Sequence, residues 1–179
     1  MILSNGYSSD VDGVKGYPLG HDSTDAVTIL RYMEQFVQQY ETQPFIREEA
    51  VRIIHGTGNN DQLTQFNTLA SYVREKMVYV RDPNGSEFIV APDILLQKIR
   101  ERGMAYGDCD DHVVLLNTLT GALGIETRIA GVKLPNSDVW NHVISQAFIG
   151  GRWYQLDSCS KRGTIVEYGE HLFADGNYA

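Results

Sequence analysis

Cysteine and basic residues are scarce in this 179-residue sequence. The two cysteines, Cys109 and Cys159, are too few for the disulfide scaffold of a small secreted domain. Lys and Arg number 15 against 23 Asp and Glu, which gives a net charge of −8. We therefore expect no nucleic-acid partner, because neutralising phosphates requires clustered basic side chains. The same charge disfavours binding to anionic membrane surfaces.

Long hydrophobic runs are also lacking. No run approaches the roughly 20 apolar residues that span a bilayer. The first residues, 1–4, contain neither the basic nor the apolar segment of a secretory signal. We therefore expect a protein without membrane contact that is cytoplasmic or virion-associated. A content of 42% hydrophobic and 21% charged residues is typical of a globular domain.

The expected organisation is one arm followed by one domain. Residues 1–22 are rich in Gly, Ser, Asp and Tyr and lack periodicity, which is typical of an extended arm rather than of a core element. Such an arm is suited to contact an assembly partner. Residues 23–179 are predicted to form a single domain, because this length suffices for one hydrophobic core.

The first half of this domain is predicted to be mostly helical. Apolar residues recur there at three- and four-residue steps, and each segment begins at a capping residue or a proline. After Gly103 ends the last of these helices, residues 104–106 are predicted to form a loop. The expected helices are 23–41, 45–54, 61–77 and 92–102, with short strands at 78–80 and 88–90.

A further helix is predicted to begin within Gly107 to Asp111. Gly107 permits a tight turn, Asp108 can cap the helix, and apolar spacing then continues to residue 123. Cys109 would lie at the positive end of the helix dipole, which favours thiolate over thiol. The neighbouring aspartates complement the dipole but oppose thiolate formation. Cys109 is therefore a candidate nucleophile, and a buried structural cysteine is the alternative.

After this helix the period of the hydrophobic pattern changes from 3.6 to 2. Strands are expected at 127–134, 140–149 and 152–157. The pair Gly150-Gly151 between two alternating runs predicts a hairpin. The order of elements is thus several helices, one buried helix and an antiparallel sheet, which predicts an α+β domain.

The hairpin register predicts a contact between a histidine and an aspartate. If the two glycines form the loop, Ile149 lies opposite Arg152 and Ile144 lies opposite Asp157. Opposite residues share a face, as do residues two apart on one strand. His142 then lies on the face of Asp157, one diagonal step away, where the carboxylate can orient the imidazole. Taken singly, each residue is also typical of a half-buried strand position or of a turn.

Together, Cys109, His142 and Asp157 supply a nucleophile, a base and an orienting group in chain order. They are the candidate catalytic residues, and no cofactor is expected. A metal site built on Cys109, His112 and nearby carboxylates is an alternative, but no second ligand pair at metal spacing is present, so no metal is expected. Cys159 is open to two interpretations, a regulatory disulfide with Cys109 or a spectator thiol.

These segments resemble the transglutaminase-like superfamily. The helix start and its continuation are similar to the nucleophile helix of that family, and two strands are similar to its histidine and aspartate strands. The matching segments are Gly107-Asp108-Cys109-Asp110-Asp111-His112, Ala122-Leu123-Gly124-Ile125, Asn141-His142-Val143 and Trp153-Tyr154-Gln155-Leu156-Asp157.

The resemblance covers residues 79–157 and implies a papain-like α+β fold with the nucleophile helix packed on a C-terminal antiparallel sheet. It also implies thiol-dependent acyl transfer by Cys109, His142 and Asp157 on a protein or peptide amide, with peptidase or amidase activity favoured over cross-linking. A Tyr-Val-Arg-Asp-Pro segment at 79–83 resembles small bacteriophage and prophage members, which implies a phage or virion setting. The alternative is a non-catalytic subunit of a larger assembly that retains the fold.

Overall fold

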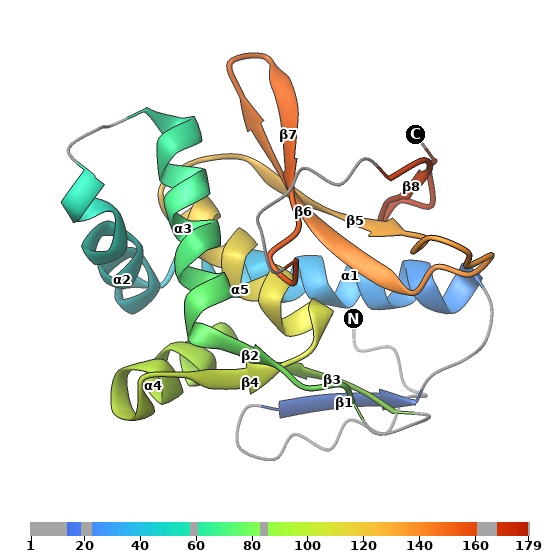
Figure 1. Ribbon diagram of the computed structural model, residues 1–179, viewed down its shortest axis with the longest axis horizontal. Helices are drawn as coiled ribbons and strands as arrows, with labels where there is room; N and C mark the ends of the chain where they lie inside the picture. Colours follow the sequence, from blue (N-terminus) through green and yellow to red (C-terminus); the bar gives the residue numbers. More distant parts are fainter. Residues whose placement is uncertain (1–13, 19–22, 58–60, 83–85, 161–167, 179) are drawn as a thin grey trace.

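The computed structural model describes residues 14–18, 23–57, 61–82, 86–160 and 168–178 (Figure 1). No helix in these ranges is long and apolar enough to cross a membrane. The helices are α1 (Ser23–Tyr40), α2 (Pro44–Ile54), α3 (Gln62–Lys76), α4 (Pro92–Arg102) and α5 (Cys109–Ala122), with a 3-10 turn at His55–Thr57. The strands are β1 (Val14–Pro18), β2 (Met77–Tyr79), β3 (Ser86–Val90), β4 (Ala105–Gly107), β5 (Thr127–Val132), β6 (His142–Ile149), β7 (Arg152–Leu156) and β8 (His171–Leu172).

Helix α5, which begins with Cys109, lies at the centre of the fold (Figure 1). It contacts all four other helices and strand β6. Residues 113–116 are four consecutive apolar residues, so the helix is apolar around its circumference rather than along one stripe. A helix of this kind is stable only when it is buried on all sides. The predicted α+β fold, with this helix packed on an antiparallel sheet, is confirmed.

Two hydrophobic clusters flank α5. In one cluster the helix packs with α2, α3 and α4, and in the other it packs with α1, β3 and β5. Helix α5 therefore joins the helical half of the chain to the sheet, and packing in both clusters fixes the position of its N-terminus. The buried residues that α5 contributes are Leu115, Leu116, Leu119 and Ala122 in the first cluster and Val113 and Val114 in the second.

The main sheet has the order β7-β6-β5-β8, and its neighbouring strands are antiparallel. The predicted hairpin register is confirmed from the Ile149–Arg152 pair at the turn to the Ser145–Leu156 pair at the other end. Gly150 and Gly151 have φ values of 59° and 85°. A two-residue hairpin turn with these signs of φ favours glycine at both positions.

The prediction of a loop at residues 104–106 is wrong. Ala105–Gly107 forms β4, which pairs in parallel with β2, and the N–H of Val80 donates to the carbonyl of Gly107 at 2.9 Å. A three-residue strand is too short to show alternation, and its partner is distant in sequence, so the pairing is determined by tertiary packing. Strand β4 ends at Gly107 and is followed directly by Asp108 and Cys109.

Part of the predicted arm belongs to a second small sheet. Val14–Pro18 forms β1, which pairs antiparallel with β3. Residues 1–13 and 19–22 lie outside the described residues, so the boundary of the arm and its assembly partner stay predictions.

Gly107 has no space for a side chain. A Cβ atom there would overlap Oδ2 of Asp111 and lie 2.7 Å from its Cγ. Asp111 is buried, and its Oδ1 accepts a hydrogen bond of 2.7 Å from the N–H of Val90, which ties α5 to β3. Gly107→Ala should displace this carboxylate and lower the free energy of unfolding in urea by about 1–3 kcal/mol. Gly56→Ala is the control, because no atom lies within 4 Å of a Cβ at Gly56; equal losses in both variants would contradict the packing argument.

Candidate active site

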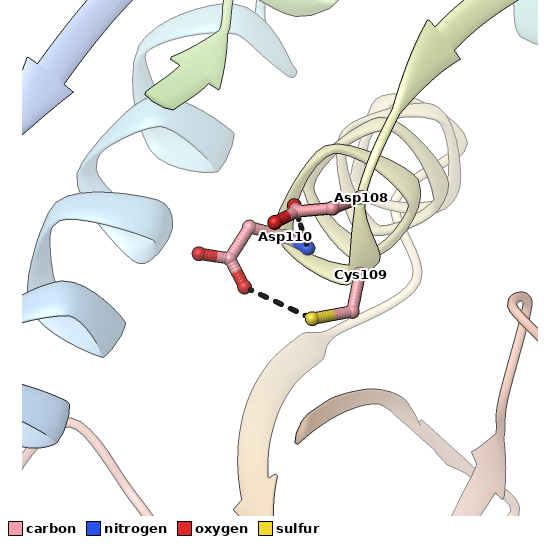
Figure 2. Close-up of side chains that lie close together, drawn as sticks. All are labelled: Asp108, Cys109 and Asp110. Carbon is pink, nitrogen blue, oxygen red and sulfur yellow. Dashed lines mark hydrogen bonds between the residues drawn. The ribbon is translucent and has the colours of Figure 1, made fainter. Parts of the chain in front are cut away.

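Cys109 is the first residue of α5, with an aspartate on either side of it in the chain. Asp108 caps the helix, since its Oδ1 accepts a hydrogen bond from the N–H of Asp110 at 3.1 Å. The thiol of Cys109 donates to Oδ1 of Asp110 across 3.6 Å, as Figure 2 shows. The side chain of Cys109 is half-buried. The thiol therefore lies at the predicted helix start, within reach of a carboxylate.

His142 and Asp157 are in direct contact, as the hairpin register predicts. Nε2 of His142 lies 3.1 Å from Oδ2 of Asp157, and both side chains are 8% exposed. His142 is the first residue of β6, and Asp157 directly follows β7. Because Nε2 faces the carboxylate, Nδ1 is the ring nitrogen that remains for a reacting partner.

Asp157 accepts two further hydrogen bonds that hold it in place. The hydroxyl of Tyr168 donates to Oδ2 at 2.8 Å, and the N–H of Cys159 donates to Oδ1 at 2.9 Å. Burial raises the pKa of Asp157, but the hydrogen bonds from His142, Tyr168 and Cys159 outweigh it and place this pKa below its ordinary value. The carboxylate is therefore ionised at neutral pH and able to orient the imidazole.

Tyr168 is a site residue that sequence reasoning missed. Its ring centroid lies 6.0 Å from that of His142. Burial and the hydrogen bond to Asp157 raise the pKa of the Tyr168 hydroxyl far above its ordinary value, so the hydroxyl stays protonated and donates. Tyr168 lies C-terminal to the segments that carry the family resemblance. No sequence motif around Tyr168 indicates its contact with Asp157.

Cys109 and the His142–Asp157 pair belong to adjacent elements. Helix α5 packs on β6, and Cys109 lies against the same hydrophobic cluster as Val143, the neighbour of His142. The structure thus brings His142 and Asp157 together directly and places Cys109 at the start of the helix that packs on their hairpin.

Comparison with known proteins supplies the family of this fold. The model of the transglutaminase-like superfamily matches residues 50–158, a segment that contains Cys109, His142 and Asp157. The chain belongs to the transglutaminase-like superfamily. No curated protein sequence matches it.

Two solved structures share the fold of this superfamily member. A "putative protease" from Parabacteroides distasonis ATCC 8503 is 14% identical, with a TM-score of 0.61 over 86% of this chain and 30% of its own. A "putative cysteine protease" from Cytophaga hutchinsonii is 20% identical, with a TM-score of 0.51 over 74% of this chain and 43% of its own. The transglutaminase-like chain therefore spans less than half the length of either protein.

The second cysteine of the transglutaminase-like domain has a different environment from the first. Burial raises the pKa of Cys159 far above its ordinary value. The negative charges of Asp157 and of three aspartates beside Cys109 raise it further; these are Asp108, Asp110 and Asp111. Neither Cys109 nor Cys159 is in a disulfide. Cys159 is thus a poor nucleophile, and a regulatory bridge between the two cysteines stays a prediction.

A group of potential metal ligands surrounds the nucleophile candidate. One donor atom from each of Asp108, Cys109 and Asp110 lies within 4.8 Å of the others, and this group, drawn from the described residues, does not include His112. Asp108 caps the helix and Asp110 accepts from the thiol. Burial lowers the pKa of His112 to about 4, so its ring is neutral at pH 7. Each of the two aspartates thus uses one carboxylate oxygen within the protein, and we assign no metal to this group.

Asp108 makes the stability of this transglutaminase-like domain depend on pH. Burial, and then the charge of Asp82, raises the pKa of Asp108 from 3.8 to about 6. The unfolded chain releases this proton near pH 4 and the folded chain near pH 6, so ionised Asp108 disfavours folding above pH 6. Asp108→Asn keeps a capping side chain. It should gain on the order of 2–3 kcal/mol of stability over wild type at pH 7, and this gain should vanish below about pH 4.

Chemical denaturation of both proteins between pH 4 and 8 measures this effect. The variant must be compared with wild type at each pH, because His112 changes the free energy of unfolding in the opposite direction. As the pH falls below about 6.5, the unfolded chain protonates this histidine before the folded chain does, and stability is lost. Asp138→Asn, in an exposed loop, is the matched control and should show no such trend. A difference between Asp108→Asn and wild type that stays constant with pH would contradict the assignment.

Proposed function

We propose that this protein is a cysteine peptidase or amidase that acts by thiol-dependent acyl transfer, with Cys109, His142 and Asp157 as its catalytic residues. The observation that supports this most is the contact between Nε2 of His142 and Oδ2 of Asp157 at 3.1 Å, on the hairpin against which the cysteine helix packs. A buried imidazole held by a charged carboxylate is one arrangement that activates a neighbouring thiol.

In the proposed reaction the thiolate of Cys109 attacks the carbonyl carbon of an amide. The proton that left the thiol is held by Nδ1 of His142 and passes to the leaving nitrogen, so the C–N bond breaks and a thioester remains. Water then attacks the thioester, giving a proton to His142, and releases a carboxylic acid and the free thiol. The N–H of Cys109, at the start of α5, is a donor for the negative oxygen of both tetrahedral intermediates.

Hydrolysis is the outcome that the comparisons favour. The two solved structures that share the fold are described as proteases, one of them as a cysteine protease. An amine in place of water would give transfer instead, as in cross-linking enzymes. From the motif resemblance we also propose a bacteriophage or virion setting, in which the arm contacts an assembly partner.

Acylation of the thiol by an activated ester tests the proposal without knowledge of the natural substrate. After exposure to p-nitrophenyl acetate, intact mass and peptide mapping should find one acetyl group on Cys109 in wild type and in Cys159→Ser, and none at that site in Cys109→Ala. A panel of peptide and cell-wall amides then identifies the substrate by amine release that Cys109→Ala lacks. Equal, slow acylation of Cys109 and Cys159 would favour the non-catalytic assembly subunit.

Tyr168→Phe should lower kcat roughly 10-fold and leave KM unchanged. The substitution removes one of the donors to Asp157, and a hydrogen bond to a charged group contributes about 1.5 kcal/mol or more. Steady-state kinetics on the substrate found above measures both constants. Tyr178→Phe makes the same chemical change at a residue that is 61% exposed and should not alter them. An unchanged kcat in Tyr168→Phe would show that Tyr168 does not position Asp157.

A further inference from the structure

Strand β2 places Tyr79 beside the start of the cysteine helix. The strands β2 and β4 run in parallel, with Tyr79 next to Gly107 across the pair (Figure 1). Neighbouring strands lie about 4.8 Å apart. The N–H of Val80 donates to the carbonyl of Gly107 at 2.9 Å and continues the pairing past Tyr79. Since Cys109 follows Gly107 by two residues, backbone hydrogen bonds fix the position of Tyr79 relative to the thiol.

The side chain of Tyr79 lies on the face of β2 that packs against α5. Residues two apart on a strand share a face, and Met77 and Ala105 on this face are buried. The ring centroid of Tyr79 lies 6.3 Å from that of His112, which is one turn after Cys109 on the same side of the helix. Tyr79 is nevertheless 48% exposed. Its side chain therefore lies between the first turn of α5 and solvent, where a molecule in solution can contact it.

The hydroxyl of Tyr79 is suited to donate a hydrogen bond. Burial raises its pKa, and the negative charges of Cys109 and Asp108 raise it further, so the hydroxyl stays protonated at neutral pH. The side chain of Arg81 makes a hydrogen bond to Tyr79. Because a guanidinium has only donors, the phenol oxygen accepts this bond and its own O–H remains able to donate. A phenol oxygen that accepts from a cation is also a stronger donor through its proton.

The proposed reaction places negative charge where the protein already has an aspartate. The tetrahedral intermediate carries its charge on the former carbonyl oxygen, and the N–H of Cys109 is one donor to it. Asp108, which directly precedes Cys109, is ionised above about pH 6 and opposes further negative charge nearby. A second donor, polarised by a cation, would offset this repulsion. A tyrosine hydroxyl is among the side-chain groups that serve this purpose in enzymes.

We propose that the hydroxyl of Tyr79 is the second donor to the negative oxygen, and that Arg81 positions and polarises this hydroxyl. This inference rests on the proposed function, because the negative oxygen forms only when Cys109 attacks a carbonyl carbon. The hydroxyl donates a hydrogen bond and keeps its proton, so it adds no step to the reaction. The bond strengthens as charge develops, so its loss should lower kcat and leave KM unchanged.

Acylation and alkylation of Cys109 in Tyr79→Phe separate this role from an effect on the thiol. Attack on p-nitrophenyl acetate forms a negative oxygen, whereas attack on iodoacetamide takes place at a saturated carbon and forms none. The substitution keeps the ring beside His112 and removes only the hydroxyl. We expect acetylation of Cys109 at pH 7, followed by peptide mass spectrometry, to slow about 10²-fold. Alkylation should stay within a factor of about 2 of the wild-type rate.

Tyr106→Phe is the matched control on the same pair of strands. Tyr106 lies opposite Val78 on the other face, is 53% exposed, and donates to the sulfur of Met104 at 3.5 Å. Its substitution should change neither rate. Arg81→Gln should slow acetylation about 5-fold in the wild-type background, the scale of one lost hydrogen bond. It should have no further effect in Tyr79→Phe, because Arg81 acts through that hydroxyl.

The outcomes distinguish this inference from the proposed function. The assignment of Tyr79 is wrong if wild type acetylates Cys109 rapidly and Tyr79→Phe does so at the same rate. It is also wrong if both reactions slow equally, since the hydroxyl would then act on the thiol. A further loss in the double variant Arg81→Gln/Tyr79→Phe would exclude the role of Arg81. Slow and equal modification of Cys109 and Cys159 in wild type by both reagents would instead contradict the proposed function itself.

Discussion

His142→Ala should lower kcat for amide hydrolysis by about 10⁴-fold or more. The variant has no group to hold the thiol proton or to return it to the leaving amine, and Asp157 loses the partner whose Nε2 lies 3.1 Å away. Steady-state kinetics, or single-turnover release of the amine where turnover is too slow, measures the loss. The fold should persist, because His142 begins a strand whose backbone pairing the substitution leaves intact.

His55→Ala is the matched control for this experiment. His55 is an exposed residue in the 3-10 turn after α2, remote in the chain from the proposed site. It should leave kcat within a factor of about 2, since exposed surface substitutions are usually near neutral. In the double variant Cys109→Ala/His142→Ala, activity should be no lower than in Cys109→Ala, because residues that act as one unit are not additive. A His142→Ala enzyme with near-wild-type kcat would exclude His142 as the base.

Asp157→Asn should lower kcat by about 10²–10⁴-fold. An amide in place of the carboxylate cannot stabilise the imidazolium, and its NH₂ group favours the wrong ring tautomer. The hydroxyl of Tyr168 and the N–H of Cys159 would also compete for one remaining acceptor oxygen. The variant should therefore lose about 1–3 kcal/mol of stability in addition to activity.

Activity of Asp157→Asn must be measured per folded molecule, with circular dichroism of the same sample. Asp138→Asn, the exposed aspartate already used above, makes the same chemical change away from the site. Full activity in folded Asp157→Asn would show that the carboxylate does not orient His142 during the reaction.

Local sequence signals were sufficient for the helices and for the hairpin. Asp61 caps α3 as predicted, with its carboxylate accepting from the N–H of Thr64 at 2.9 Å. Gly103 ends α4 with a φ of 81°. The pair of glycines at 150 and 151 fixed the register and hence the contact between His142 and Asp157. In each case the signal and the structure that it determines lie within one or two neighbouring elements.

The missed features depend on residues that are distant in sequence. Strand β4 forms only because β2 offers a parallel partner, and β1 forms only against β3. Tyr168 reaches Asp157 from a segment without a motif. No periodicity or turn signal reports such contacts, because they arise from packing.

Thiol alkylation with iodoacetamide tests most directly whether the three side chains act together. Rates should be followed separately for Cys109 and Cys159 by peptide mass spectrometry between pH 5 and 9. We expect Cys109 to react much faster than Cys159 at pH 7, and this selectivity to disappear in His142→Ala. Slow alkylation of both cysteines at similar rates in wild type, or unchanged selectivity in His142→Ala, would contradict the proposed catalytic site.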